Sequence, residues 1–335
     1  MRRELKWRFA IAVTSLLFIL MAGAALSKEK NMVMPTIRYW SNMDSEAMPL
    51  EMTIYEAGLG ILQVRSNRGQ EKETVVGMFR AQVAPEQLDG LFAALRSDAF
   101  RSLSPPEGIT PGQGVRSLSI FESKQQLVEK FATDDHPPSP PFLEAEGVAL
   151  KLVAALRQKP VQAVSLQGVT IPKQFVRGST VQFDLSLANP GSEAVALPAP
   201  ARWEAAGTML MAMAVRSDVP PTQITPQHQH FESVSGGEVT LSSINPEEGR
   251  IAIAPGQQLK LSFTKKIDWP PGLYDVHLAL KTTLTDSTGQ GVERYELLSP
   301  KVPVQCEGKA ETKGDRVESA PSPADDEPPQ FVLDA

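Results

Sequence analysis

The stretch Pro255–Leu280, PGQQLKLSFTKKIDWPPGLYDVHLAL, decides the fold of the second half of the chain. It contains two runs in which apolar and polar residues alternate, and a proline–glycine pair precedes each run. The apolar positions of the two runs are Leu259, Leu261, Phe263, Tyr274, Val276, Leu278 and Leu280. A period of two is typical of strands with one buried face. The stretch therefore predicts two strands of a β-sandwich.

Further short strands separated by turn residues fill Val161–Cys306. One of them, Val181–Leu187, alternates in the same way and ends at the turn Asn189-Pro190-Gly191. The other predicted strands of this region include Met209–Val215, Gly237–Leu241 and Glu293–Cys306. About seven short strands with regular turn signals are typical of an immunoglobulin-like β-sandwich. We expect residues 161–306 to form one.

The first half, residues 49–160, mixes strand and helix patterns. The predicted strands are Glu51–Tyr55, Gly60–Arg65, Thr74–Val83, Val115–Glu122 and Gln126–Phe131. A helix beginning at Pro85 and another between Phe142 and Leu156 each carry one apolar stripe at helical spacing. The order βββαββα predicts a small antiparallel α+β domain, so the whole chain is assigned to the α+β class.

Both halves resemble known domains. The segments PLEMTIYEAGLGILQVRSNRG and VAPEQLDGLFAALRSDAFRSL, at residues 49–69 and 83–103, resemble an uncharacterised α+β domain that recurs in exported bacterial proteins. In the second half, QFDLSLANPG, APGQQL and WPPGLYDVHLAL together resemble the immunoglobulin-like sandwich named after the bacterial intracellular proteinase inhibitor. Each resemblance implies a fold and no activity.

The two ends of the chain differ from the middle. Residues 1–27 read MRRELKWR, FAIAVTSLLFILM and AGAALS, which are the basic, apolar and small-residue regions of a signal peptide. The apolar run is also nearly long enough to remain as a membrane anchor. Residues 28–48 are expected to be a polar lead-in, and residues 307–335 a disordered acidic tail. We expect a periplasmic or secreted protein that contacts the membrane only through an uncleaved leader.

Composition excludes several classes of function. The net charge of −6 opposes binding to nucleic acid, and no basic stripe offsets it. A single cysteine, Cys306, rules out an internal disulfide framework and any CxxC site for metal or redox chemistry. Since Cys306 ends an alternating run, we expect a small buried side chain there. No cofactor is expected.

One group of residues has types that bind metals. Extended backbone would put three residues of QHQHFE on one side, and an apolar strand nearby carries alternating methionines. The candidate ligands are His228, His230, Glu232, Met209, Met211 and Met213. Imidazole and thioether groups together would suit a periplasmic copper or zinc carrier. The simpler interpretation is a solvated loop for the histidines and core filling for the methionines, so no metal site is expected.

A second alternative is an envelope hydrolase built on Asp134, Asp135 and His136. An acid beside a histidine could act as an orienting group and a base. The three residues immediately precede Pro137 and Pro138, which favours a turn that ends a strand. No catalytic residues are therefore assigned.

The long segment Ser217–Gly236 interrupts the predicted sandwich and is rich in proline, glutamine, serine and histidine. Long connections in compact domains are usually functional or disordered, and loops on rigid scaffolds often carry recognition. Phe231 is the aromatic residue of this segment and the candidate anchor for a partner. We expect a non-enzymatic binding or structural protein whose partner is another envelope protein. The oligomeric state stays open.

Overall fold

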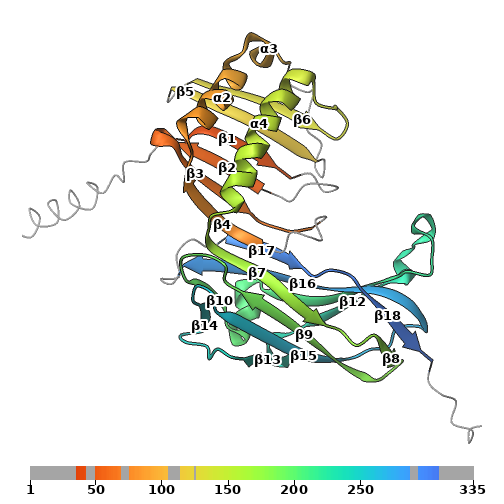
Figure 1. Cartoon of the computed structure of the whole chain (residues 1–335). Coiled ribbons are helices and arrows are strands. Elements are labelled where there is room, and N and C mark those ends of the chain that lie inside the picture. The colour runs from red at the N-terminus through yellow and green to blue at the C-terminus, as the bar shows by residue number, and fades with distance from the viewer. Residues whose placement is uncertain are drawn as a thin grey trace, which may run out of the picture.

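The computed structural model describes residues 35–42, 50–68, 75–104, 114–123, 126–286 and 293–308. Figure 1 shows two halves: a sheet covered by helices, and below it a sandwich of two sheets. The predicted leader and the acidic tail from residue 309 onward lie outside the described residues. Within the described ranges, no helix is both long enough and apolar enough to span a bilayer.

The first half is a six-stranded antiparallel sheet with helices on one face (Figure 1). Its strands lie in the order β4-β3-β2-β1-β5-β6. Their bounds are β1 Pro35–Ser41, β2 Leu50–Tyr55, β3 Leu59–Val64, β4 Val75–Gln82, β5 Val115–Ser123 and β6 Gln126–Thr133. The helices are α2 Pro85–Arg96, α3 Asp98–Arg101 and α4 Pro140–Arg157.

The two long helices follow the apolar stripes of the sequence. Helix α2 begins at Pro85, where a missing N–H costs nothing, and it buries Leu91 and Leu95 completely. Helix α4 likewise buries one stripe, made of Phe142, Ala145, Ala149, Leu152, Val153 and Leu156. The apolar faces of α2 and α4 both pack on the same side of the sheet, and their buried residues belong to its core.

Strand β1 corrects the expected lead-in. Residues 35–41 pair with both β2 and β5, so they form a central strand of the sheet, and Ile37 and Tyr39 are buried. The observed order is ββββααββα, with one strand before those that the sequence predicts. The signal is weak because only two of the strand's three buried residues, Ile37 and Tyr39, are apolar or aromatic, while Ser41 is polar.

The second half contains two antiparallel layers with a shared core. One layer contains β13, β15, β9 and β7, and the other contains β12, β11, β16, β10 and β14 together with β17, β18 and β8. The bounds of the strands are β7 Pro160–Thr170, β8 Gln174–Val176, β9 Thr180–Ala188, β10 Val195–Pro198, β11 Met209–Arg216, β12 Gln229–Val234, β13 Val239–Ser242, β14 Arg250–Ile253, β15 Gln258–Lys266, β16 Gly272–Asp286, β17 Glu293–Leu298 and β18 Val302–Glu307.

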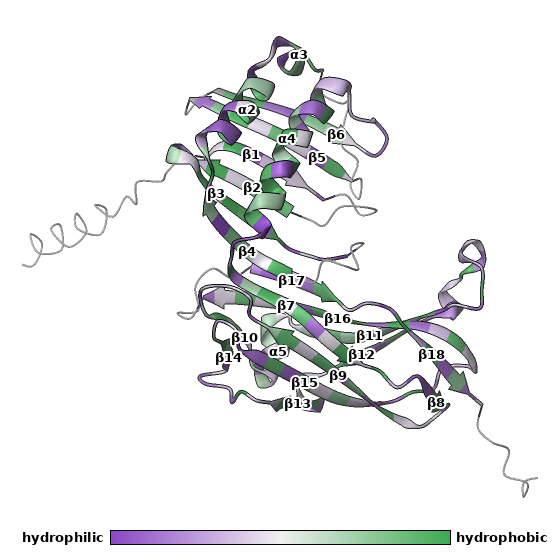
Figure 2. Ribbon diagram, in the orientation of Figure 1, coloured by the Kyte–Doolittle hydropathy of each residue, from purple (hydrophilic) through white to green (hydrophobic). Residues whose placement is uncertain are grey.

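The quoted stretch supplies one strand to each layer of this sandwich. Strand β15 belongs to the first layer and β16 to the second. All seven predicted core positions of the stretch are 2% exposed or less, which confirms the alternation as a burial pattern. Figure 2 shows the hydrophobic residues distributed along these strands. The second half is an immunoglobulin-like β-sandwich.

The two halves share one sheet. Strand β4 of the first half pairs with β7 of the sandwich, so ten strands form an unbroken sheet from β13 to β6. Gly77 permits this junction: its φ is +135°, and a Cβ there would meet the carbonyl oxygen of Gln162 at 2.3 Å. The domain boundary expected at residue 160 therefore coincides with the first residue of β7, a strand that serves both halves.

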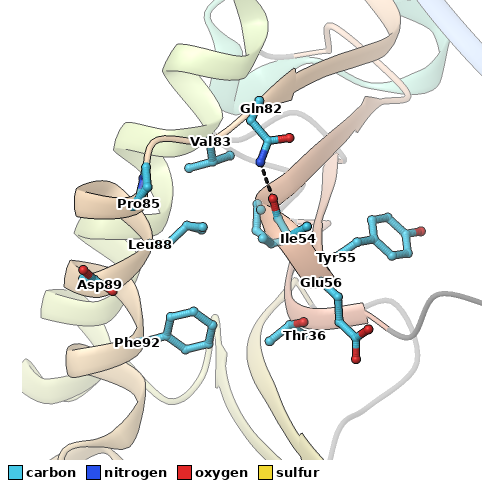
Figure 3. A pocket seen from close by; sticks show the side chains of 12 residues that line it. Thr36, Ile54, Tyr55, Glu56, Gln82, Val83, Pro85, Leu88, Asp89 and Phe92 are labelled. Carbon is cyan, nitrogen blue, oxygen red and sulfur yellow. Dashed lines mark hydrogen bonds between the residues drawn. The ribbon is translucent and has the colours of Figure 1, made fainter.

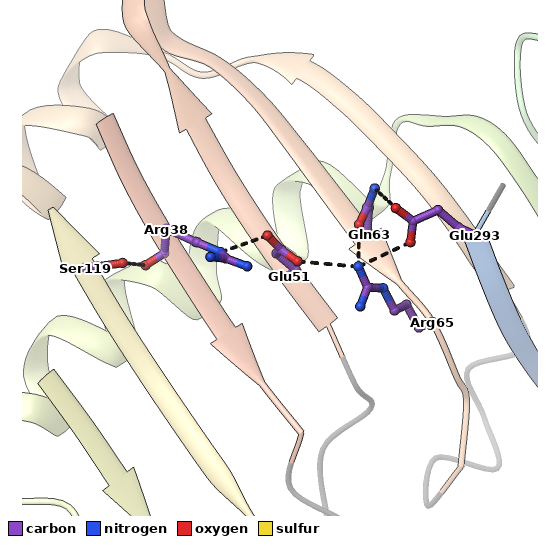
Figure 4. A network of polar contacts seen from close by, with 6 residues as sticks. All are labelled: Arg38, Glu51, Gln63, Arg65, Ser119 and Glu293. Atoms are coloured by element: carbon purple, nitrogen blue, oxygen red, sulfur yellow. Dashed lines mark hydrogen bonds and ion pairs between the residues drawn. The ribbon is translucent and has the colours of Figure 1, made fainter. Parts of the chain in front are cut away.

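Polar side chains also link the halves across the uncovered face of the sheet (Figure 4). Arg38 pairs with Glu51 at 2.8 Å, and Arg65 bridges Glu51 at 3.5 Å and Glu293 of β17 at 3.2 Å. Gln63 donates to the same carboxylate of Glu293 at 3.2 Å. Each exposed pair contributes little alone, about 0–1 kcal/mol. Together, these side-chain contacts hold the start of β17 against the end of β3.

Two segments differ from their predicted state. Residues 229–234, expected in a loop, form strand β12, and Val234 on it is buried. The pattern is hard to read because polar His230 and Glu232 occupy inward positions. At the other end, β18 continues through Glu307, one residue beyond the expected end of the sandwich.

Candidate functional site

The methionines of β11 lie on the outer face of the sandwich. Leu210, Ala212 and Ala214 point into the core and are 0 to 1% exposed. Met209, Met211 and Met213 occupy the alternate positions and are partly or well exposed. Core filling, the expected role of these methionines, is wrong. Because both sets of β11 are apolar, the period of two could not choose which set faces inward.

Strand register brings residues from three strands together on this outer face. Met213 lies opposite Phe231 of β12 on one side and His277 of β16 on the other. We call the group Met209, Met211, Met213, Phe231, Leu273 and His277 the methionine face. Phe231 is 56% exposed, Leu273 46% and Met209 41%, so three large apolar side chains face solvent. Large apolar side chains exposed on one face of a protein often mark an interaction site.

Phe231 lies at the edge of its layer. Strand β12 ends the strand order, with β11 as its neighbour. An edge strand presents unpaired backbone N–H and C=O groups along its open side. The candidate anchor residue is therefore exposed, and it lies on a strand rather than in a loop.

The candidate ligands His228, His230 and Glu232 do not converge. His230 stacks on Trp269 with ring centroids 5.8 Å apart, and Glu232 Oε1 accepts a 2.8 Å hydrogen bond from Trp269 Nε1. The Nδ1 atom of His228, before the strand, accepts from the backbone N–H of Thr225 at 3.1 Å. Across the described ranges, no group of three or more His, Cys, Asp or Glu side chains could hold a metal ion.

Burial shifts the pKa values of titratable groups around the sandwich core. Burial lowers the pKa of His230, and it also lowers the pKa of His277, with help from the charges of Lys301 and Arg68. Burial raises the pKa of the Cys306 thiol, which donates to the carbonyl oxygen of Trp269 at 3.4 Å. Cys306 is 0% exposed, so the structure places it as a small core side chain.

The first half contains a cavity of about 520 Å³ between α2 and the β2–β3 turn (Figure 3). Its apolar wall includes Ile54, Val83, Leu88 and Phe92, and its rim includes the exposed carboxylate of Glu56. Its size is typical of small-molecule pockets. The lining contains no histidine, lysine or cysteine, and its side chains with polar groups are Thr36, Tyr55, Glu56, Gln82 and Asp89. The apolar wall could accept an apolar group.

A buried polar cluster lies under α4. Tyr39 donates to Glu146 at 2.9 Å, and Arg116 pairs with the other oxygen of this carboxylate at 2.8 Å. Glu146 is 3% exposed. Burial and the Glu146 charge raise the pKa of the Tyr39 hydroxyl well above its usual range. The cluster ties α4 to strands β1 and β5, and both oxygens of Glu146 are satisfied.

The hydrolase candidates form a turn after β6. Asp134 accepts a hydrogen bond from the backbone N–H of Gly114 at 3.0 Å, and the His136 ring lies 3.3 Å from the Thr133 hydroxyl. These contacts are those of a strand end. The described residues bring no serine or cysteine nucleophile into hydrogen-bond contact with this histidine.

Comparison with known proteins adds little. No family model matches the chain, and no curated protein matches it. A CARDB domain from Pyrococcus furiosus is 10% identical over 43% of this chain and 94% of its own, with a TM-score of 0.22. The PapD-like domain of human CEP192 is 14% identical over 40% and 84%, with a TM-score of 0.20. An alkylpurine DNA glycosylase of Pseudomonas fluorescens is 13% identical over 50% and 38%, with a TM-score of 0.23. Similarities of this size carry no argument about function.

Proposed function

We propose that this chain is an exported, non-enzymatic binding protein of the bacterial envelope that holds another envelope protein on its methionine face. The observation that carries the proposal is the position of Phe231: a 56% exposed aromatic side chain on an edge strand, beside Met213. Exposed aromatic residues dominate many binding energies, because a rigid ring supplies contact area at little cost in entropy.

The partner is an extended protein segment that adds a strand beside β12. The open edge of β12 offers the backbone groups, and Phe231 offers a side-chain contact on the outer face. Methionine side chains around it are flexible and polarizable, so they adapt to apolar groups of different shapes. Backbone hydrogen bonds along β12 supply affinity, and side-chain contacts on the methionine face supply selectivity.

The finer relationships are part of the same proposal. We infer that the sandwich is of the type named after the bacterial intracellular proteinase inhibitor, on the strength of QFDLSLANPG, APGQQL and WPPGLYDVHLAL. We infer also that the first half is the uncharacterised α+β domain of exported bacterial proteins. Both support a scaffold role, since neither resemblance carries catalytic residues.

The test compares two matched variants. Phe231→Ser removes the proposed anchor, while Leu127→Ser removes a 48% exposed side chain from β6, an edge strand of the separate ten-stranded sheet. Partners are captured by crosslinking in envelope extract, identified by mass spectrometry and then tested as purified proteins. We expect Phe231→Ser to weaken binding of the purified partner by about tenfold or more, the loss typical of an interface anchor. Leu127→Ser should bind as the unaltered chain does.

Thermal melts accompany the binding measurements, and both variants should melt within a few degrees of the unaltered protein, because exposed side chains contribute little to stability. Equal binding by Phe231→Ser and the unaltered protein would refute the assignment of this face.

A further inference from the structure

Two thioethers and one imidazole meet on the methionine face. Met213 of β11 and His277 of β16 lie directly opposite each other in an antiparallel pair, and Met211 is the diagonal neighbour of His277. Directly opposite residues have Cβ atoms about 4.5–5.5 Å apart, and diagonal ones remain within reach of long side chains. The register therefore places two thioether side chains and one imidazole side chain at neighbouring positions of the outer face.

The imidazole of His277 has an unused nitrogen. Its Nε2 atom is buried, and among the residues that the structure describes no atom forms a hydrogen bond with it. A buried polar atom without a partner is unfavourable, so native proteins leave few of them. A bound cation would accept the lone pair of the neutral ring and remove this cost.

The backbone on either side of His277 is held in place. It lies where β16 changes partner, from β17 at Leu298 to β18 at Val302. The turn between these strands is fixed to β16 by Ser299, whose N–H donates to the carbonyl oxygen of Leu278 at 2.8 Å and whose hydroxyl accepts from the Leu278 N–H at 2.9 Å. The residues on either side of His277 are thus held in place, Val276 by its pairing with β18 and Leu278 by Ser299. The side chains of Met211 and Met213 keep access to solvent.

The two thioether sulfur atoms and the imidazole nitrogen determine which metal ion this site would bind. Thioether sulfur is a soft ligand that favours monovalent copper, and imidazole binds copper as well as zinc. Hard cations such as calcium and magnesium require oxygen ligands, which this group lacks. A metal between sulfur and nitrogen needs the two atoms about 4 Å apart, given bond lengths of about 2.3 and 2.0 Å. Long methionine side chains opposite a histidine can meet that requirement.

We propose that Met211, Met213 and His277 form a binding site for Cu(I) on the outer face of the sandwich. The site shares Met211 and Met213 with the candidate ligands named from the sequence, but its imidazole is that of His277, because His230 and Glu232 face the core and contact Trp269. It also goes beyond partner binding: the copper ion needs no second protein. The ion is bound and released as Cu(I), so no oxidation or reduction is involved.

The experiment titrates the purified full-length protein, prepared without a histidine tag, with Cu(I) under reducing anaerobic conditions and with Ag(I) as a stand-in that does not change oxidation state. Competition with a chromogenic Cu(I) chelator gives the affinity, and NMR of the methionine methyl groups reports which methionines bind. We expect one ion per chain and shifted signals for Met211 and Met213.

Matched variants decide between the possible ligands. Met213→Leu and His277→Gln should each weaken binding by about tenfold or more, since ligand loss exceeds the 10–100-fold effect of losing a supporting residue. Met78→Leu, which removes a half-buried thioether from β4, and His228→Gln should leave the affinity unchanged. Leucine preserves the volume of methionine, so Met213→Leu should fold normally.

Three results would overturn the site: less than stoichiometric binding by the unaltered protein, undiminished binding by Met213→Leu and His277→Gln together, or loss of binding in His228→Gln. Preference for Zn(II) over Cu(I) would also reject it. Since Phe231→Ser leaves all three ligands in place, it should still bind the ion, so this test and the partner test can fail independently.

Discussion

The carboxamide of Asn67 makes both hydrogen bonds to Leu298 that a neighbouring strand would make. Its Nδ2 donates to the Leu298 carbonyl oxygen at 2.8 Å, and its Oδ1 accepts from the Leu298 N–H at 2.7 Å. The adjacent residue Ser66 forms a parallel bridge with Glu296. A loop of the first half thus completes the backbone pairing of β17 in the sandwich.

Replacing Asn67 with Ala should destabilise the protein by about 2–4 kcal/mol. The change removes two hydrogen bonds and leaves two backbone groups of Leu298 unsatisfied, at about 1–3 kcal/mol for each buried group. Asn67 is 4% exposed, so water cannot easily take its place. Urea denaturation measures the loss. A loss below about 0.5 kcal/mol in Asn67→Ala would show that the contact is not part of the folded state.

Gly77→Ala should destabilise the junction of the halves by about 2–4 kcal/mol, because a side chain there combines an unfavourable φ with a clash. The new Cβ would lie 2.6 Å from the Cα of Ala163 on β7. Gly90→Ala is the matched control: no atom lies within 4 Å of its Cβ, and Gly90 lies in α2. That control should gain about 0.5–1 kcal/mol. Similar unfolding midpoints for the two variants would contradict the β4–β7 pairing.

The protein should lose stability as the pH falls below about 6.5, the ordinary histidine value. Burial, Arg216 and His228 lower the pKa of His230 in the folded state, while Glu232 opposes them. The unfolded chain therefore binds more protons in this range, and folding becomes less favourable as the pH falls. His230→Phe keeps a ring against Trp269 without titrating. Melting temperatures at pH 7.5 and 5.0 should differ less in that variant, and an unchanged difference would exclude His230 as a cause.

A chain that ends at Gly308 should melt within about one degree of the full-length protein, because an acidic, proline-rich segment buries too little apolar surface to offset its ordering. The cut must follow Glu307, whose carbonyl oxygen accepts from the Arg177 N–H at 2.8 Å. A cut before Glu307 removes this contact and the end of β18. A melting temperature several degrees lower for the chain ending at Gly308 would mean that the tail packs on the fold.

The leader predicts a mature protein that begins between about Ala25 and Lys28 and is released by osmotic shock. Mass spectrometry of the protein from its natural host checks both points. Recovery of chains that retain Met1 in the membrane fraction would show an anchor instead.

The sequence predicts an element where one face is apolar and the other polar. Strands β9, β15 and β16 and helices α2 and α4 meet this condition, and each forms where the pattern indicates. It fails for β12, whose inward positions include His230 and Glu232: Glu232 accepts a hydrogen bond from Trp269, and the ring of His230 stacks on Trp269. It fails also at β1, whose buried positions include the polar Ser41 and whose open face carries Trp40 beside Arg38.

Cross-strand neighbours explain what the sequence could not show about the candidate site. His277 is 64 residues from Met213 in the numbering, and only the β11–β16 register places them opposite each other. Within β16 alone, His277 looks like any polar residue on the outward side of a strand. Phe231, by contrast, could be identified early because an aromatic residue among polar neighbours stands out locally.

The ten-stranded sheet fixes the distance between its two edge strands, β13 and β6. Ten strands at a spacing of about 4.8 Å extend about 43 Å from β13 to β6, and backbone hydrogen bonds link every neighbouring pair along the way. A linker between domains would let that distance vary, but a sheet changes its width only by breaking a row of bonds. The shared sheet therefore holds β13, at one edge of the sandwich, at a fixed distance from β6, at the far edge of the first half.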